Sequence, residues 1–145
     1  MVELAVQSDA LAPASGPYVP GVKVSVAGAD ILFISGQVSE SPTDHCVARG
    51  DVTGQAEQAL KNLLAVVEEA GGHVTDVAKV TVFLRNMEDR DLVAEARRRF
   101  FGDHKPASTL VEVSKLARPD WLIEIEAIAV INCDSRNPEE YERGG

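Results

Sequence analysis

Two glutamates lie in the stretch of the sequence whose residue pattern most resembles a β-strand. Within residues 122–131, Glu124 and Glu126 are two positions apart, so a strand would project both side chains from one face, about 7 Å apart. Their neighbours on that face include Ile128 and Val130. A carboxylate among apolar groups loses hydration, which raises its pKa and allows it to act as a general acid or base. The pattern also fits glutamates at a wet sheet edge or in ion pairs across a subunit contact.

Ser35 and Gly36 follow the other clear strand. The apolar residues 31–34 indicate a buried strand, and polarity returns at Ser35 and Gly36, where glycine permits an unusual backbone or the close approach of another group. Such a strand end suits the rim of a small-molecule pocket, although a plain strand followed by a turn gives the same pattern. Tyr18 offers a phenol hydroxyl at a pocket rim, or it covers the edge of the core with its hydroxyl in water.

Hydrophobic periodicity indicates the elements that would position these residues. Their expected order is β-β-α-β-α-β-β, in which two strand–helix–strand crossovers place both helices on one face of a mixed α+β sheet. The other face then needs a cover, so self-association is a physical expectation. Residues 1–20 contain several prolines and indicate an extended, loop-like lead-in, and Gly28-Ala29-Asp30 indicates a turn. The expected strands lie at residues 22–26, 31–35, 77–84, 109–113 and 122–131.

The two helices differ in charge. The first begins near Asp51, carries an apolar stripe at helical spacing, and ends at two glycines. Gln55 belongs to the polar positions of this helix, which we expect mostly to face water. Near the end of the second helix, the three arginines at 97–99 favour a solvated helix end over an anion site, because positive charge is stabilised there. We expect a single domain over residues 1–131, followed by a polar C-terminal tail over 132–145.

The composition limits the class of protein. The chain has 145 residues, 45% of them hydrophobic and 26% charged, which fits one globular domain. A net charge of −9 argues against nucleic acid and against an anionic membrane as partners. Two cysteines are too few for a disulfide scaffold, and neither a signal peptide nor a membrane span is apparent, so we expect a cytoplasmic protein. The histidines and cysteines lack metal-ligand spacing, so no metal site is expected.

Several short segments together form an ordered set of motifs. They are Gly16-Pro17-Tyr18 and residues 31–37, 55–63, 77–84, 100–101, 106–107, 111–113 and 123–130. On these segments the sequence, from about Leu11 to Ile131, resembles the Rid family (reactive intermediate deaminase, YjgF-type). The resemblance implies a chorismate-mutase-like fold and a homotrimer whose sheets form an inner barrel, with ligand clefts between subunits. Such a trimer would cover the second face of the sheet.

The resemblance also implies a reaction and a set of residues. Deaminating members of the family hydrolyse reactive enamines and imines, such as 2-aminoacrylate released by pyridoxal-phosphate enzymes, to a ketoacid and ammonia, without a metal or organic cofactor. Their cleft contains a Tyr, a Ser at a strand end, the following Gly, an Arg and a Glu. The Tyr and Glu positions correspond to Tyr18 and Glu124, which become the catalytic candidates. Ser35 and Gly36 correspond to the Ser and Gly and become substrate-binding candidates.

Two positions depart from the family pattern. The motif Pro-Ala-Arg, whose Arg clamps a substrate carboxylate by two parallel hydrogen bonds, is Pro106-Ala107-Ser108 here. Ala94 stands where the family often has Asn; Ser108 and Ala94 are the remaining substrate-binding candidates. We therefore expect poor turnover of 2-iminopropionate-type acids, and a preference for a neutral or differently charged enamine or imine. Lys105 is a poor replacement for the lost Arg, because its ammonium lacks the fork geometry of a guanidinium.

Two functions of different kinds remain open. One is a cofactor-free hydrolase or deaminase for an enamine, imine or related small molecule, which the retained Tyr18, Ser35 and Glu124 favour. The other is a non-catalytic trimer that binds a small metabolite or a protein and has a regulatory role, which Ser108 favours. Ribonuclease activity has also been attached to the family, but the acidic charge and the lack of a catalytic His pair argue against it.

Overall fold

The computed structural model describes residues 2–132, which form one layer of strands and one layer of helices. The strands are β1 (Val2–Val6), β2 (Gly21–Val26), β3 (Ala29–Gln37), β4 (Val77–Leu84), β5 (Ala107–Glu112) and β6 (Ile123–Asn132), the helices are α1 (Val52–Glu69) and α2 (Arg90–Phe101), and the 3-10 turns are η1 (Val74–Asp76) and η2 (Met87–Asp89).

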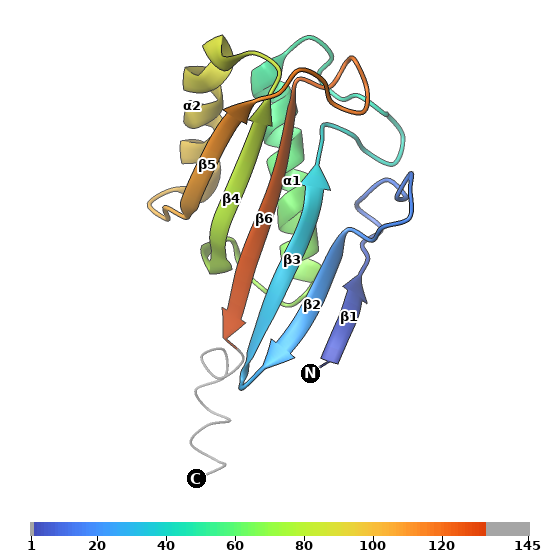
Figure 1. The fold of residues 1–145 in the computed structure, drawn as a ribbon, viewed down its shortest axis with the longest axis vertical. Helices are drawn as coiled ribbons and strands as arrows, with labels where there is room; N and C mark the ends of the chain where they lie inside the picture. Colours follow the sequence, from blue (N-terminus) through green and yellow to red (C-terminus); the bar gives the residue numbers. More distant parts are fainter. Residues whose placement is uncertain (1, 133–145) are drawn as a thin grey trace.

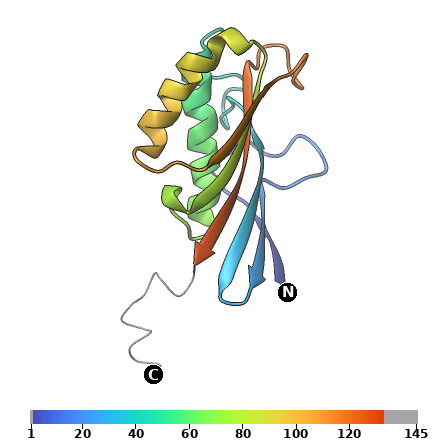
Figure 2. The same cartoon turned by 60° about the vertical axis from the view of Figure 1, so that its left-hand side comes forward.

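The strands of this part of the chain make one mixed sheet in the order β1-β2-β3-β6-β4-β5. Only β4 and β5 pair in parallel; the other neighbours are antiparallel. Both helices lie on one face of the sheet (Figure 1 and Figure 2). The α+β class and the placement of the helices are therefore confirmed. Apart from Asn132, the predicted tail lies outside the described residues.

The hairpin of β2 and β3 turns slightly earlier than expected. Val26 pairs with Ala29, which leaves Ala27 and Gly28 as the two turn residues, with φ angles of 47° and 85°. Positive φ at both positions matches a primed two-residue turn, whose twist suits the flanking strands. Ala29 and Asp30, expected in the turn, belong to β3 instead.

The strand β1 is a correction to the expected loop-like lead-in. It pairs antiparallel with β2, from Val2 opposite Ser25 to Val6 opposite Gly21, and the side chain of Val6 is buried in the core. The prolines that indicated a loop begin only at Pro13, so they place no restriction on the first residues. A short edge strand carries little pattern of its own, because its pairing partner determines it.

Alternation along β6 separates the two faces of the sheet. Ile123, Ile125, Ala127 and Ala129 are buried beneath the helices, while the residues between them are partly or largely exposed. We call the face opposite the helices the open face. In the described part of the chain, neither helix has the length and apolar character needed to cross a membrane.

Gln55 corrects the expectation that the polar residues of α1 face water. Its side chain is fully buried. Its amide nitrogen donates to the carbonyl of Asp120 at 3.0 Å, and its amide oxygen accepts from the backbone nitrogen of Leu122 at 2.9 Å. A buried amide is tolerated because these partners satisfy it. Gln55 therefore fastens the start of α1 to the segment that leads into β6.

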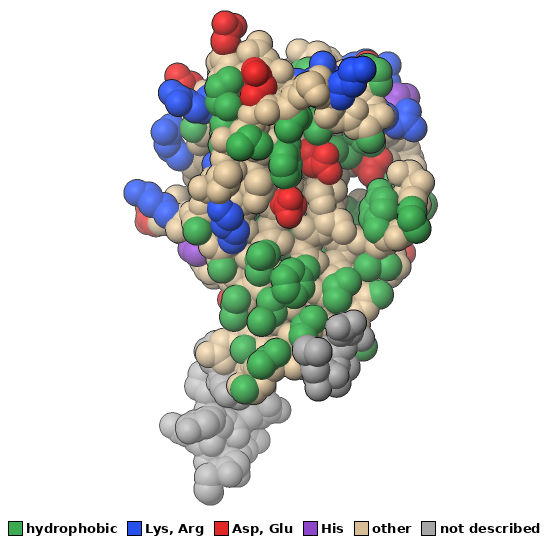
Figure 3. All heavy atoms as spheres, in the orientation of Figure 1, with side chains coloured by type: hydrophobic (Ala, Val, Ile, Leu, Met, Phe, Trp, Pro, Cys, Tyr) green, Lys and Arg blue, Asp and Glu red, His purple; other side chains and the backbone are tan. Residues whose placement is uncertain are grey.

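The open face carries exposed apolar side chains on adjacent strands. Val26, Phe33 and Val130 are 47%, 48% and 44% exposed, and Figure 3, which views this face, shows hydrophobic side chains gathered over its lower half and acidic side chains at its centre. Contiguous apolar surface of this kind marks an interaction site. Self-association through this face stays a prediction.

Candidate functional site

The site is built around an irregularity in β3. Ile34 pairs with Ala127 and Gln37 pairs with Ile125, so Ser35 and Gly36 together stand opposite Glu126 alone. Two residues opposite one is the mark of a β-bulge, which bends the strand and redirects its backbone. The strand therefore continues through the residues where we expected it to end, and the bulge gives this segment its special position.

Glu124 lies directly against the backbone of Gly36. A Cβ atom added to Gly36 would lie 2.8 Å from Cδ and 3.0 Å from Cγ of Glu124, and closer still to Oε1. Carbon atoms in ordinary contact are about 3.5–4.0 Å apart. Glycine at position 36 thus leaves space for this carboxyl group, and a side chain there would force the carboxyl group to move.

The environment of Glu124 favours its protonated form. The side chain is about half-buried, and burial raises the pKa of Glu124 above its ordinary value, with a smaller contribution from the negative charge of Glu126. Within residues 2–132 no hydrogen bond or ion pair to the Glu124 carboxyl offsets this effect. A carboxyl group of this kind can hold a proton closer to neutral pH and transfer it to a bound molecule.

Ser35 connects the bulge to the segment that carries Tyr18. Its hydroxyl donates to the carbonyl of Val19 at 2.6 Å, and its backbone nitrogen donates to the carbonyl of Pro20 at 2.9 Å. The hydroxyl hydrogen is therefore used within the protein, and only its oxygen can accept a further hydrogen bond. In this arrangement Ser35 positions the chain at residues 18–20.

Tyr18 and Gly36 line the same small cavity. The ring of Tyr18 is half exposed, with its hydroxyl 3.4 Å from Oγ of Ser15. The cavity has a volume of about 20 Å³, which is about enough for one water molecule. It is lined by Leu11, Ala12, Ala14, Tyr18, Pro20, Gly36, Gln37, Glu40 and Asn62. Tyr18 and Glu124 thus approach Gly36 from the cavity and from β6, respectively.

Glu40 and Asn62 also line the small cavity, although neither was predicted as a site residue. Burial raises the pKa of Glu40, and the nearby charge of Arg118 opposes this increase. Asn62 is buried in α1 and donates to the carbonyls of Val38 at 3.0 Å and Glu40 at 2.8 Å. Its position four residues before Val66 on the apolar stripe is a detectable signal. Glu40 gives no such signal, because it lies in a loop without periodicity.

Ser108 and Ala94 lie elsewhere in the protomer. Ser108 belongs to β5 and pairs with the buried Val80 of β4, and its hydroxyl accepts a hydrogen bond of 2.8 Å from Nη2 of Arg97 in α2. Ala94 lines a cavity beside α2 together with Arg97. The structure thus places Glu124 against Gly36, next to Ser35 in the same bulge, whereas Tyr18 lines a cavity that includes Gly36 but not Glu124. Ser108 and Ala94 lie at the edge formed by α2 and β5. That these residues bind a substrate stays a prediction.

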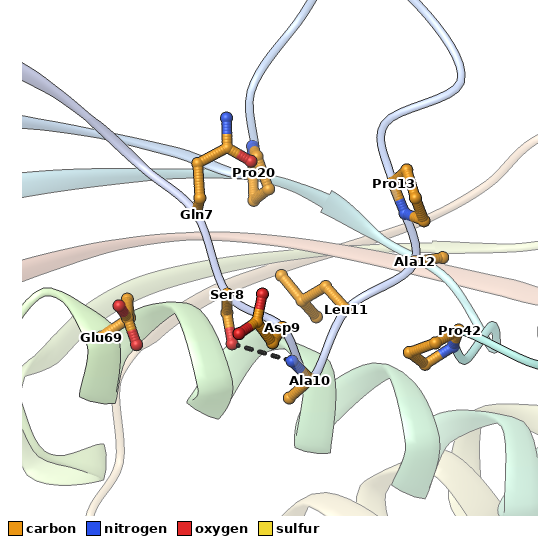
Figure 4. A pocket seen from close by; sticks show the side chains of 10 residues that line it. All are labelled: Gln7, Ser8, Asp9, Ala10, Leu11, Ala12, Pro13, Pro20, Pro42 and Glu69. Atoms are coloured by element: carbon orange, nitrogen blue, oxygen red, sulfur yellow. Dashed lines mark hydrogen bonds between the residues drawn. The ribbon is translucent and has the colours of Figure 1, made fainter.

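A larger cavity, of about 780 Å³, lies beside the N-terminal segment (Figure 4). It is lined by residues 7–13, Pro20, Pro42 and Glu69, and it shares Leu11, Ala12 and Pro20 with the small cavity. None of the candidate residues lines it. Within its rim, the backbone nitrogen of Ala10 donates to Oγ of Ser8 at 3.2 Å.

The chain is similar to proteins of known family and structure. Residues 8–131 match the family model described as Endoribonuclease L-PSP. A RutC family protein of Pyrococcus horikoshii is 43% identical over 114 residues, which cover 79% of this chain and 86% of that protein. The 2-iminobutanoate/2-iminopropanoate deaminase of Salmonella typhimurium is 43% identical over 123 residues, which cover 82% and 91%. The crystal structure of the YjgF gene product of Escherichia coli matches with a TM-score of 0.76 at 40% identity, covering 88% of this chain and 98% of that chain.

Proposed function

Because the chain belongs to the YjgF/Rid family, whose model is described as Endoribonuclease L-PSP, we propose that it is a cofactor-free deaminase that hydrolyses an enamine or imine. The observation that carries this proposal is the Glu124 carboxyl group, which is half-buried against the backbone of Gly36 and has a raised pKa. The similarity to a deaminase of 2-iminobutanoate and 2-iminopropanoate supports the same reaction class.

In the proposed reaction Glu124 moves protons between water and the substrate. Protonated Glu124 first donates its proton to the nitrogen of an imine or to the β-carbon of an enamine, and either step gives the iminium ion. The oxygen of a water molecule then attacks the carbon of the C=N bond, while the Glu124 carboxylate takes a proton from that water molecule. Glu124 returns this proton to the nitrogen, the C–N bond breaks, and ammonia leaves. The carbonyl oxygen loses its remaining proton to the carboxylate, so Glu124 ends protonated as it began.

Tyr18 and the bulge would position the substrate for this reaction. The Tyr18 hydroxyl is accessible for a hydrogen bond to the substrate or the attacking water. Gly36 exposes its backbone beside the carboxyl group, so a small molecule can approach Glu124 closely there. Within a single protomer, the small cavity beside Tyr18 and Gly36, at about 20 Å³, is too small for such a substrate.

We propose that a homotrimer completes the site. The exposed apolar side chains of the open face, such as Phe33 and Val130, would be covered by neighbouring subunits. Glu124 projects from this same face, so a neighbouring subunit would enclose it and exclude bulk water. Enclosure would raise the pKa of Glu124 further and strengthen its interactions with the substrate.

The proposed substrate is not the usual 2-imino acid. Ser108 cannot bind a carboxylate through two parallel hydrogen bonds as a guanidinium can, and its hydroxyl already accepts from Arg97. Without the bidentate clamp of a guanidinium at position 108, a substrate carboxylate would bind more weakly. A neutral or differently charged imine or enamine avoids this cost.

The alternative is a non-catalytic trimer that binds a small metabolite at the same cleft. The presence of Ser108 is the observation that favours it, since that hydroxyl supplies no charge for a carboxylate. Ribonuclease activity, which the name of the family model suggests, is disfavoured by the net charge of −9.

An assay of ammonia release separates the first two functions. A dehydratase generates 2-aminoacrylate in place, and a panel of neutral imines is added separately. We expect turnover of at least one neutral imine and little acceleration with 2-aminoacrylate. Glu124→Gln should reduce turnover by about 100- to 10,000-fold, whereas Glu68→Gln, a matched change at an exposed site on α1, should leave it unchanged. Ligand binding without turnover of any substrate would favour the non-catalytic function.

A further inference from the structure

A cavity lies on the helix side of the sheet, between α2 and the loop that leads to β5. Its volume is about 230 Å³. Its lining includes Ala94, Arg97, Arg98 and Phe101 of α2, whose spacing of three, four and seven residues places them on one side of the helix. The loop contributes the rest of the lining: Gly102, His104, Lys105 and Pro106.

Three of the residues that line this cavity are basic, and none of its described lining residues is acidic. Arg97, Arg98 and Lys105 form no ion pair with a carboxylate within residues 2–132. The neighbouring Arg99 differs, because it pairs with Glu57 at 3.1 Å and with Glu95 at 3.4 Å. In a chain with 23 acidic and 14 basic residues, carboxylates are present in excess, yet within the described residues none of them pairs with these three cations.

Arg97 is held in place and partly removed from water. Its Nη2 donates to Oγ of Ser108 at 2.8 Å, and burial lowers the pKa of Arg97. A guanidinium that has lost part of its hydration and has only a neutral partner gains by binding an anion. This finding divides the arginine run: Arg99 fits the expected solvated helix end, and Arg97 does not.

We propose that this cavity binds a small oxyanion with two negative charges, either a phosphate group or a short dicarboxylate. Guanidinium groups match the geometry of both anions, and three cations favour two negative charges over one. The volume lies below the range of about 300–1,000 Å³ that is typical for drug-sized ligands, so the ligand must be small. The site goes beyond the proposed deamination: Glu124 projects from the open face, whereas this cavity lies beside α2. It shares Ala94 and, through Arg97, Ser108 with the predicted substrate-binding residues.

Isothermal titration calorimetry of the full chain tests the proposal with inorganic phosphate and with succinate, and with acetate as a monoanion. We expect saturable binding of phosphate or succinate and at least tenfold weaker binding of acetate. Whichever dianion binds more tightly identifies the chemical source, and either result supports the site. The matched variants are Arg97→Gln, Arg98→Gln and Arg99→Gln, which remove the same charge from consecutive positions of α2.

Arg97→Gln and Arg98→Gln should each weaken binding about tenfold, and Arg99→Gln less than twofold. The Arg98 side chain is exposed and makes no hydrogen bond or ion pair within the described residues, so its variant remains informative if Arg97→Gln does not fold. Ser108→Ala should weaken binding by a smaller factor, because it only releases Arg97. Absence of saturable binding by both dianions would overturn the proposal. An equal loss in Arg99→Gln would do the same, since it would show attraction to general positive charge.

Discussion

Replacing Gly36 with alanine tests whether the bulge exists to receive Glu124. The new Cβ would lie 2.8 Å from Cδ of Glu124, so the carboxyl group must move. It stands at the end of a flexible side chain, and rotation away from its preferred position costs about 1 kcal/mol. A displacement of about 1 Å from the reacting position can lower a catalysed rate about 100-fold. Gly36→Ala should therefore reduce turnover much more than it reduces stability.

A double-mutant cycle isolates the contact. Alanine in a strand is about 0.5–1 kcal/mol more favourable than glycine. In a Glu124→Ala background, which removes the three nearest atoms, Gly36→Ala should therefore be neutral or stabilising. Urea denaturation of the four proteins should give a coupling free energy of at least about 1 kcal/mol. A coupling near zero, together with unchanged turnover in Gly36→Ala, would refute the role assigned to the glycine.

Three further changes test other parts of the account. Gln55→Leu should lower the free energy of unfolding by about 2–4 kcal/mol in a denaturant titration, because it leaves the Asp120 carbonyl and the Leu122 nitrogen without this partner; a loss below about 0.5 kcal/mol would contradict this. Phe33→Asp on the open face should dissociate the proposed trimer in light scattering, whereas Leu92→Asp, at an equally exposed site (48%) on α2, should leave it intact; an unchanged mass for Phe33→Asp would count against the proposed interface. Ser108→Arg should raise kcat/KM for carboxylate-bearing imines about tenfold or more, as one bidentate pair would; no gain would show that Ser108 is not what limits these substrates.

The sequence was sufficient to predict the sheet and the candidate acid because both depend on local periodicity. Alternation along β6 predicts the face that carries Glu124 and Glu126 without knowledge of the partner strands. The contact between Glu124 and Gly36 was not predictable in the same way, since it depends on the register of β3 against β6 and on a bulge within it. Glycine at the end of an apolar run indicated only that the backbone there could adopt an unusual conformation or be approached closely by another group.

The features that were predicted wrongly or not at all also have physical causes. Gln55 lies among polar residues at the start of α1, and its burial depends on two backbone groups about 65 residues later in the chain. The strand β1 depends on pairing with β2. The hydrogen bond from Arg97 to Ser108 joins α2 to the strand that follows it. Arg97 could therefore be distinguished from the solvated Arg99 only once β5 was placed beside β4.

The pH dependence of kcat/KM in the wild type and in Glu126→Gln tests the central claim most directly. The account predicts an alkaline limb, because Glu124 must be protonated to begin the reaction. Glu126 helps to raise the pKa of Glu124, so removing its charge should shift that limb to lower pH while activity at acidic pH is retained. A limb at the same pH in both proteins would contradict the assignment of Glu124 as the group that transfers the proton.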